Sequence, residues 1–416
     1  MTANGGDGSS WARVPRHLVV LLGALSAFAP LSIDMYLPAL PRLQRGFSAP
    51  PSLAQATLTA CLVGLAGAQL FVGPLSDRLG RRRPLLVGVG LYALASLACA
   101  LAPNLPLLIL LRLVQGAAGA AGIVIARAVV RDLRSGDEAA RLFSLLLVVN
   151  GFAPALAPVI GAQLLHLGSW RVTFVALALL GGLLFVASLA LFPETLGQRA
   201  PAPPPRRQRT IYRELLGDRR FDAYALLSGL VTGAMFAYIA GAPFVLENQF
   251  GVSPVGFSGV FAMNATGIVA ASQLGARLVG CFGSRALLLA GVALGALGAA
   301  LLAVAEIGGL GVGGVIPGLF LVVSAVGLVS PNATALAMAD YPSVAGSASG
   351  LLGVGQFAIG SAFAPLVGAF GNRTAVPMVA VIGAFSLAAV LLAGMLIVRD
   401  RAEHRPAAAP GGTVTR

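Results

Sequence analysis

The chain has 416 residues, of which 57% are hydrophobic and only 10% charged, and its formal net charge is +13. A soluble domain carries about a quarter charged residues, so a chain this apolar could not cover its own surface in water. The composition excludes a soluble enzyme, a secreted disulfide scaffold and a disordered chain. It also disfavours an outer-membrane barrel, whose strands alternate polar and apolar residues.

Twelve apolar segments follow one another along the chain, each close to the roughly 20 residues that a helix needs to cross a bilayer. The first one follows Arg13 and Arg16 as a signal peptide would, but it is too long and contains Asp34, so we expect an uncleaved first helix. The sequence therefore predicts an all-α membrane protein with twelve transmembrane helices. The expected spans are 18–39, 53–74, 85–103, 105–127, 141–166, 171–192, 222–246, 256–279, 286–306, 310–339, 344–370 and 374–398.

The basic residues are all arginines, and they cluster between the apolar segments. If the N-terminus is cytoplasmic, 23 of the 28 arginines fall on the cytoplasmic side of the spans. This asymmetry follows the positive-inside rule, so the positive charge predicts membrane orientation rather than nucleic acid binding. We expect a multi-pass protein of the cell inner membrane with both termini in the cytoplasm.

One long polar insertion, 193–221, divides the spans six and six. It holds a Pro-rich run at 201–205 followed by arginines, which is typical of a solvated linker beside anionic lipid. A weak repeat between 69–83 and 273–285 favours two related halves around a central site. The expected organisation is a cytoplasmic tail (1–17), a six-helix bundle (18–192), the cytoplasmic linker (193–221), a second six-helix bundle (222–398) and a cytoplasmic tail (399–416).

Asp34 and Arg112 are ionisable residues inside expected spans. Each costs at least about 2.5–3.5 kcal/mol at the bilayer centre, so each should face a cavity or a partner. From the helical rise, Asp34 lies about 24 Å along an outward-running helix and Arg112 about 10 Å from the outer face. Both depths fall in the outer half of the bilayer, and Gln115 shares the Arg112 face. Our hypothesis is that Asp34 carries a proton and Arg112 tunes its pKa. The alternative is a static ion pair between two helices.

The loop between the second and third spans carries the motif GPLSDRLGRRR (73–83). Its first glycine is expected to permit close helix contact, and Gly80 a tight turn. Asp77 could sit at a helix N-terminus or pair with arginine. Arg81 could pair with Asp132, at the end of the fourth span, as a breakable cytoplasmic latch; the alternative is a loop that only fixes topology. The expected gating residues are Gly73, Asp77, Arg78, Gly80, Arg81, Arg131 and Asp132.

These motifs resemble those of the major facilitator superfamily. The 73–83 motif looks like the family signature between helices 2 and 3, and LRLVQG (111–116) is similar to the helix 4 motif. NGFAPALAPVIG (150–161) resembles the helix 5 motif of drug–proton antiporters, although Ala157 and Ala162 stand where glycine is usual. The residues that carry this antiporter likeness are Gly151, Pro154, Pro158 and Gly161.

Further segments resemble the Bcr/CflA drug-resistance branch of that family. They are IDMYLPALP (33–41), WR (170–171), PETL (193–196), AGAPFVL (240–246) and AGSASG (345–350). The resemblance implies two six-helix bundles around a cavity lined by helices 1, 4, 7 and 10, which would bring Asp34 and Arg112 together. It further implies proton-coupled export of amphiphilic antibiotics, such as phenicol- or bicyclomycin-like compounds, by alternating access.

Aromatic, methionine and amide side chains within the spans are candidates for contacting a substrate. Aromatic rings and methionine give an adaptable apolar wall, and amides give directional contacts. Each of these residues could instead serve packing or helix–helix bonding. The candidates are Tyr36, Gln115, Tyr238, Met263, Asn264, Asn332 and Gln356.

The sequence thus favours a secondary transporter that exports small drug-like molecules in exchange for protons, acting as a monomer without cofactor, metal or nucleic acid. The chain has no lysine, so it cannot contain a Gly-Lys-Ser/Thr phosphate-binding loop. Alternatives are export or import of a metabolite by the same fold and, less favoured, a ligand sensor or a membrane-embedded enzyme. Cys61, Cys99 and Cys281 lack metal-ligand spacing and are expected to be buried.

Overall fold

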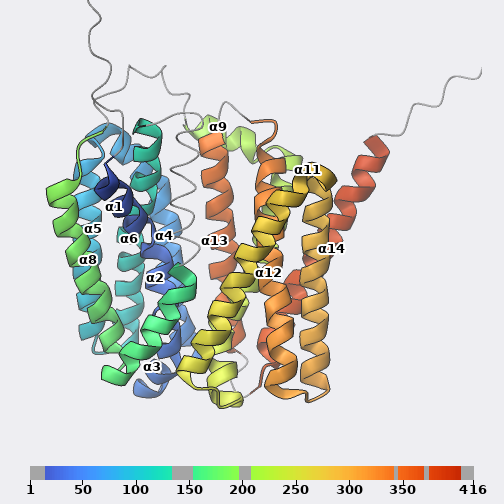
Figure 1. The fold of residues 1–416 in the computed structure, drawn as a ribbon, viewed down its shortest axis with the longest axis horizontal. Helices are drawn as coiled ribbons and strands as arrows, with labels where there is room; N and C mark the ends of the chain where they lie inside the picture. The colour runs from blue at the N-terminus through green and yellow to red at the C-terminus, as the bar shows by residue number, and fades with distance from the viewer. Residues whose placement is uncertain (1–14, 134–152, 196–207, 342–344, 370–373, 404–416) are drawn as a thin grey trace, which may run out of the picture.

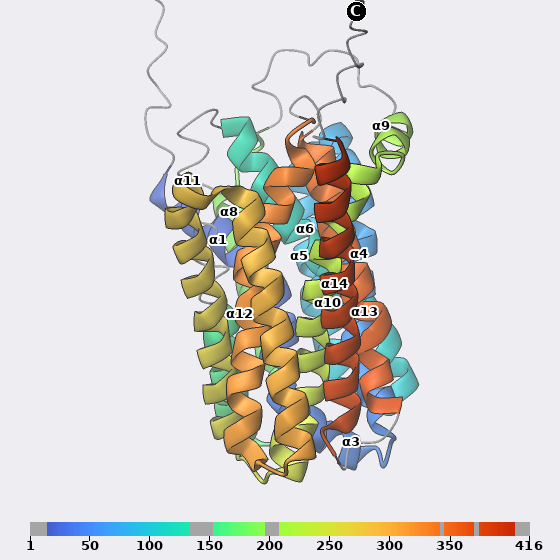
Figure 2. The ribbon, with the colours of Figure 1, turned by 90° about the vertical axis from the view of Figure 1, so that its right-hand side faces the viewer.

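The computed structural model describes residues 15–133, 153–195, 208–341, 345–369 and 374–403. Within these residues the regular secondary structure is entirely helical. Figure 1 shows two groups of helices side by side, with α1 to α8 in one group and α10 to α14 in the other. In Figure 2 the long helices run nearly parallel from one end of the molecule to the other, with α9 at one end and α3 at the opposite end.

The first group contains the helices up to residue 191. They are α1 (Arg16–Ser26), α2 (Phe28–Asp34), η1 (Leu37–Ala39), α3 (Leu40–Gly46), α4 (Pro51–Leu79), α5 (Arg82–Leu101), α6 (Leu105–Leu133), the helix Ala153–Leu167 and α8 (Arg171–Leu191). The second group follows a short surface helix. Its elements are α9 (Gln208–Leu215), α10 (Arg219–Phe244), the π-helical turn η3 (Val245–Gln249), α11 (Pro254–Ile307), α12 (Gly311–Met338), α13 (Ala345–Ala369) and α14 (Val376–Glu403).

Among the described residues, eight helices are long and apolar enough to cross a membrane, and the bent run from α1 to α3 makes a ninth. The 54-residue α11 is two helices joined at Gly283, and the apolar helices Ala153–Leu167 and α13 add two more. This arrangement agrees with the twelve predicted spans. The chain is therefore a multi-pass membrane protein.

The first span is broken, whereas a single helix was expected over 18–39. It divides at Ala27, and a 3₁₀ turn follows α2. The physical cause lies in the prolines, which have no backbone N–H. Pro30 and Pro38 therefore leave the carbonyls of Ser26 and Asp34 without their helical donors. The break places Asp34 at the end of a short helix rather than inside a continuous one.

Two glycines turn the chain between helices in the same way in the two halves. Gly80 has φ 86° and ψ 164° between α4 and α5, and Gly283 has φ 76° and ψ 157° between the two arms of α11. A side chain would strain both positions, since positive φ favours glycine. The shared conformation falls in the two segments, 69–83 and 273–285, that the sequence relates as a weak repeat.

Close packing between α4 and α6 depends on Gly64 and Gly116 rather than on Gly73. A Cβ at Gly64 would collide with the Leu113 carbonyl, and one at Gly116 with the carbonyl of Cys61. A Cβ at Gly73 would meet only a Val124 methyl group, at 3.8 Å, so the close contact predicted there is wrong. Small residues allow this approach of backbones, which helix packing in lipid requires.

We call the end formed by residues 76–83, 132–133, 194–195 and 208–220 the arginine-rich end. Here Asp218 caps α10 by accepting a hydrogen bond from the Arg220 N–H (2.8 Å) and another from the Tyr341 hydroxyl (2.8 Å). Burial alone would raise the pKa of Asp218, but these bonds outweigh it and hold the pKa below its usual value. The bond to Asp218 in turn raises the pKa of Tyr341 to about 12.

Candidate functional site

A cavity of about 470 Å³ lies between the two groups of helices. Its wall is mostly apolar and aromatic with a few polar side chains, which is the usual composition of a small-molecule site. Both groups contribute, from α1, α2, α4, α6 and the helix Ala153–Leu167 on one side and from α10 to α13 on the other. The polar lining residues are Ser26, Asp34, Gln69, Arg127, Tyr238, Thr334 and Gln356.

The cavity extends toward the arginine-rich end and is closed at the opposite end. There the Gln55 amide donates to the Ala240 carbonyl (3.0 Å), and the Ser258 hydroxyl donates to the Pro158 carbonyl (2.8 Å). Each bond joins one helix group to the other. Arg127, which lines the cavity on the side of the arginine-rich end, is exposed. The two groups are thus held together at the end of the molecule that carries α3.

Asp34 ends α2 and lines this cavity with only 6% of its surface exposed. Among the residues that the structure describes, it has no ion-pair partner. The helix break that follows Asp34 presents its carboxyl group to the cavity. An ionisable group in a membrane span that faces an internal cavity is a candidate functional group.

Arg112 is completely buried on α6 and is held by acceptors that carry no negative charge. Its guanidinium donates to the carbonyls of Ser32 (3.1 Å) and Thr57 (3.3 Å) and to the side-chain oxygen of Gln115 (2.6 Å). The rings of Tyr36 and Phe174 lie 4.9 and 5.5 Å from its central carbon. Cation–π contact and hydrogen bonds therefore replace a counter-ion.

Arg112 satisfies a backbone group that the broken first span leaves free. The Tyr36 N–H bonds to the Ile33 carbonyl instead of the Ser32 carbonyl, which its helical spacing would predict. The Ser32 carbonyl then accepts from Arg112. Arg112 thus stabilises the break that precedes η1.

The predicted meeting of Asp34 and Arg112 is therefore wrong in this structure. Arg112 donates to the Ser32 backbone carbonyl, and no ion pair joins it to Asp34 within the described residues. Similar depth in the membrane does not bring two side chains together when one lines the cavity and the other is packed inside its helix group. Asp34 belongs to the cavity, and Arg112 belongs to the packed interior of the first group.

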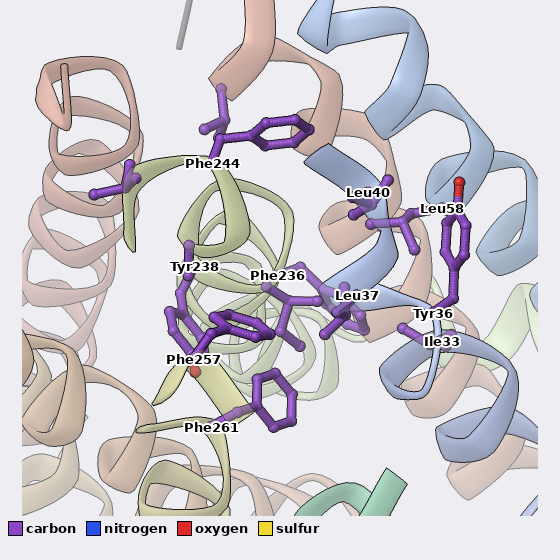
Figure 3. Close-up of a cluster of buried hydrophobic side chains, with 14 of the residues drawn as sticks. Ile33, Tyr36, Leu37, Leu40, Leu58, Phe236, Tyr238, Phe244, Phe257 and Phe261 are labelled. Atoms are coloured by element: carbon purple, nitrogen blue, oxygen red, sulfur yellow. The ribbon is translucent and has the colours of Figure 1, made fainter. Parts of the chain in front are cut away.

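The substrate candidates divide into three sets. Tyr238 and Gln356 line the cavity, and Asn264 is buried on the face of α11 that reaches it. Tyr36 and Gln115 are sealed around Arg112, and Figure 3 shows Tyr36 pointing away from Tyr238. Two further candidates lie off the cavity wall: Met263 is exposed, and the Asn332 amide donates to the Leu328 carbonyl of its own helix.

Several lining residues were missed by the sequence analysis. Phe236 and Phe261 form part of the wall, but an aromatic ring in an apolar run gives no sign of which face it occupies. Arg127 was counted only as an orientation signal at the end of a span. Gln69 was quoted only in the repeat, which does not show which face of its helix it occupies.

The predicted ion pair between Arg81 and Asp132 is present at the arginine-rich end, with Arg81 Nε 2.7 Å from Asp132 Oδ2. Arg81 also donates to Asp77 (2.5 Å) and to the Ser76 hydroxyl (2.7 Å). Burial acts to lower the pKa of Arg81, but its hydrogen bonds to the two carboxylates outweigh this and raise the pKa above its usual value. Asp77 lies in the last turn of α4, so it pairs with arginine rather than capping a helix N-terminus.

Glu194 completes this cluster and was missed as a gating candidate. Its carboxylate accepts hydrogen bonds from the backbone N–H groups of Arg81 (2.8 Å) and Arg82 (3.1 Å), at the start of α5. The neighbouring Thr195 hydroxyl donates to Asp132 (3.2 Å). All of these residues belong to the first group of helices, so the cluster braces one group and does not join the two. The PETL motif (193–196) was its sequence signal.

The remaining gating and helix 5 residues are distributed as follows. Arg78 is exposed, and Arg131 lies in the last turn of α6, its side chain outside the described part of the structure. Gly151 is also outside the described residues. Pro154 lines the cavity, the Pro158 carbonyl accepts the bond from Ser258, and a Cβ at Gly161 would collide with the Met35 carbonyl.

No group of three or more metal-ligating side chains occurs within the residues that the structure describes. Cys61 and Cys99 are buried as expected, but Cys281 is exposed, which contradicts the prediction for that residue. It lies just before the Gly283 turn, where the two arms of α11 meet at one end of the molecule.

Comparison with known proteins extends the sequence resemblance. The model of the Major Facilitator Superfamily matches residues 22–365. The uncharacterized MFS-type transporter YdgK of Bacillus subtilis is 40% identical over 368 residues, covering 88% of this chain and 91% of the relative. A bicyclomycin resistance protein homolog of Haemophilus influenzae is 31% identical (92% and 96% covered), and a chloramphenicol resistance protein of Pseudomonas aeruginosa is 33% identical (92% and 91%).

The fold is also similar to solved transporter structures. The crystal structure of the nucleoside transporter NupG superposes with a TM-score of 0.75, covering 92% of this chain and 99% of that one. The two sequences are 13% identical, so this likeness concerns the fold alone.

Proposed function

This chain belongs to the major facilitator superfamily, and from that premise we propose that it exports amphiphilic drug-like molecules across the cell inner membrane in exchange for protons. The names of the bicyclomycin and chloramphenicol resistance relatives favour drug efflux. The observation that carries the proposal is the position of Asp34, the one acidic side chain among the described residues that line the cavity between the two helix groups.

Asp34 is the proton carrier. It has cavity access and no counter-ion among the described residues, so its protonation can respond to what enters the cavity. A bound proton neutralises the carboxyl group, and a bound substrate can take the proton's place. One proton moving inward gains about 2.3 kcal/mol per 100 mV of membrane potential, which is sufficient to drive efflux without ATP.

The substrate is a small amphiphile. The cavity of about 470 Å³ lies within the size range of drug-binding pockets. Phe236, Phe261 and Met235 supply an apolar wall, and Tyr238 and Gln356 supply hydrogen-bonding groups at fixed places. Such a wall accepts molecules of varied shape, because aromatic and methionine side chains can repack around them.

Transport proceeds by alternating access between two bundles, 18–192 and 222–398. With the arginine-rich end in the cytoplasm, as the positive-inside rule requires, the cavity extends toward the cytoplasm and is closed outside. The bonds from Gln55 to Ala240 and from Ser258 to Pro158 must break for the outer end to open. The Arg81–Asp132 cluster acts as the gating brace of the N-terminal bundle during this change.

The direct test is transport by the purified protein in proteoliposomes of defined orientation. An imposed pH gradient is expected to drive chloramphenicol against its concentration gradient, and a protonophore is expected to abolish this uphill movement. Substrate movement that follows the substrate gradient alone and ignores the pH gradient would contradict proton antiport. No movement of phenicols or bicyclomycin under any gradient would contradict drug export.

A further inference from the structure

Several buried polar side chains of the C-terminal bundle have unused hydrogen-bonding capacity, and two of them, Tyr238 and Asn264, lie beside the cavity. The Tyr238 hydroxyl and the Asn264 amide lie within hydrogen-bonding reach of each other, and among the described residues neither has any other hydrogen-bond partner. Each residue is only 1% exposed. A buried polar atom left without a partner is costly, so natural proteins rarely keep one without a use.

These atoms are close to one another and adjoin the cavity. Tyr238 lines the cavity from α10, and its ring stacks on Phe261 of α11 with centroids 5.8 Å apart. Asn264 lies between Phe261 and Ile268, which both line the cavity, at the spacing that puts the three residues on one face of α11. Figure 3 shows Tyr238 grouped with Phe257 and Phe261, across from Ile33 and Leu37.

We propose that Tyr238 and Asn264 form a subsite that binds a neutral hydrogen-bonding group of the substrate, such as an amide or a hydroxyl. This subsite rests on the export function proposed above. An asparagine amide offers donors and an acceptor side by side, and a tyrosine hydroxyl offers one of each. Neither carries charge, so the group they recognise best is a neutral one with its own donor and acceptor.

The subsite also explains how one bound substrate could contact both bundles. Asp34 stands on the N-terminal bundle and lines the same cavity as Tyr238. A substrate held by Tyr238 and Asn264 therefore lies between the carboxyl group and the C-terminal bundle. Phe261 and Phe236 would pack against the apolar body of the substrate, while Tyr238 and Asn264 would form hydrogen bonds to its polar group.

The test uses the full chain, purified in nanodiscs, and two ligands. Chloramphenicol carries hydroxyl and amide groups, and its diacetate has both hydroxyls blocked. Wild-type protein is expected to bind chloramphenicol about tenfold or more tighter than the diacetate, as loss of one or two hydrogen bonds to a buried site requires. Tyr238→Phe or Asn264→Leu is expected to weaken chloramphenicol binding and to abolish this preference. Met263→Leu, one residue away and outside the cavity wall, serves as the matched control and is expected to keep it.

The possible outcomes test the subsite separately from the proposed drug export. A preference that survives in both cavity variants, or that disappears equally in the Met263 control, overturns the subsite while leaving drug export in place. Wild-type protein that binds neither compound overturns both. Because the readout is a ratio of two affinities within one variant, a general loss of folded protein changes both values together and cannot imitate the expected result.

Discussion

Asp34 and Arg112 are both ionisable, both buried and both carried by helices of the N-terminal bundle, yet their surroundings are opposite. Arg112 has three hydrogen-bond acceptors and two aromatic rings around it and no access to the cavity. Asp34 has no ion-pair partner within the described chain and faces the cavity. The contrast separates two uses of a charge inside a membrane protein.

A charge that must exchange a proton needs a path to water and cannot be permanently neutralised. A charge that stabilises a helix break needs fixed acceptors and benefits from exclusion of water, because hydrogen bonds are stronger in a low-dielectric interior. Asp34 meets the first requirement and Arg112 the second. We therefore assign proton coupling to Asp34 and a positioning role to Arg112, through the Ser32 carbonyl.

The largest expected effect follows from removing the acid. Asp34→Asn is expected to reduce uphill transport driven by a pH gradient by about 100-fold or more, since the amide cannot carry a proton. Folding should be preserved, because the carboxyl group has no structural partner to lose. The measurement is chloramphenicol flux in proteoliposomes with an imposed pH gradient.

Glu306→Gln, at the end of α11 and away from the cavity, is the matched control and should transport normally. If the Asp34 variant still concentrates substrate at the wild-type rate, the contrast between the two buried charges has no functional meaning. Equal loss in both variants would point to a general effect of removing an acid.

Hydropathy was sufficient to place both residues in the correct helices, because a spanning helix is defined by its own length and composition. Their mutual orientation could not be predicted, since it depends on how the chain turns at Pro30 and Pro38. The Arg81–Asp132 pair was predictable, because both lie at span ends on one side. Glu194 lies in the quoted PETL motif, but its bond to the Arg81 N–H was not predictable, since it joins residues 113 positions apart through the packing of α8 on α5.

Removing the cation tests the other half of the contrast. Arg112→Met fills the apolar space but leaves the Ser32 and Thr57 carbonyls and Gln115 without their donor, so a loss of roughly 3 kcal/mol of stability is expected. The measurement is the unfolding midpoint of the purified protein in detergent. The unfolding midpoint of Arg112→Lys should fall between those of wild type and Arg112→Met, because a lysine ammonium group matches the planar set of acceptors around the guanidinium poorly. A methionine variant as stable as wild type would show that the helix break does not need Arg112.

The brace at the arginine-rich end sharpens the contrast, since it is a charged cluster that lies outside the membrane interior. Asp132→Asn is expected to slow turnover roughly tenfold, about 1.4 kcal/mol of barrier, with little change in substrate affinity. Asp77→Asn should have a smaller effect, because the Asp77 side chain is 62% exposed and that of Asp132 only 5%. Turnover and Kd measured on the same preparations decide this, and a change confined to Kd would argue against gating.

The smallest effect is expected at Asp218, an acid outside the membrane with the partners that Asp34 lacks. Its pKa is depressed in the folded protein by the Arg220 N–H and the Tyr341 hydroxyl, so its stabilising contribution is present above about pH 4 and is lost as the pH falls through the folded value. Asp218→Ala removes the cap of α10 and should cost about 1 kcal/mol at neutral pH. Asp218→Asn keeps a capping oxygen, so it should retain most of that stability. It should lose only the contribution of the ionised carboxylate, which varies with pH. Unfolding midpoints between pH 7 and about pH 3 distinguish the two variants, and parallel pH profiles for wild type and Asp218→Asn would refute the ionic contribution.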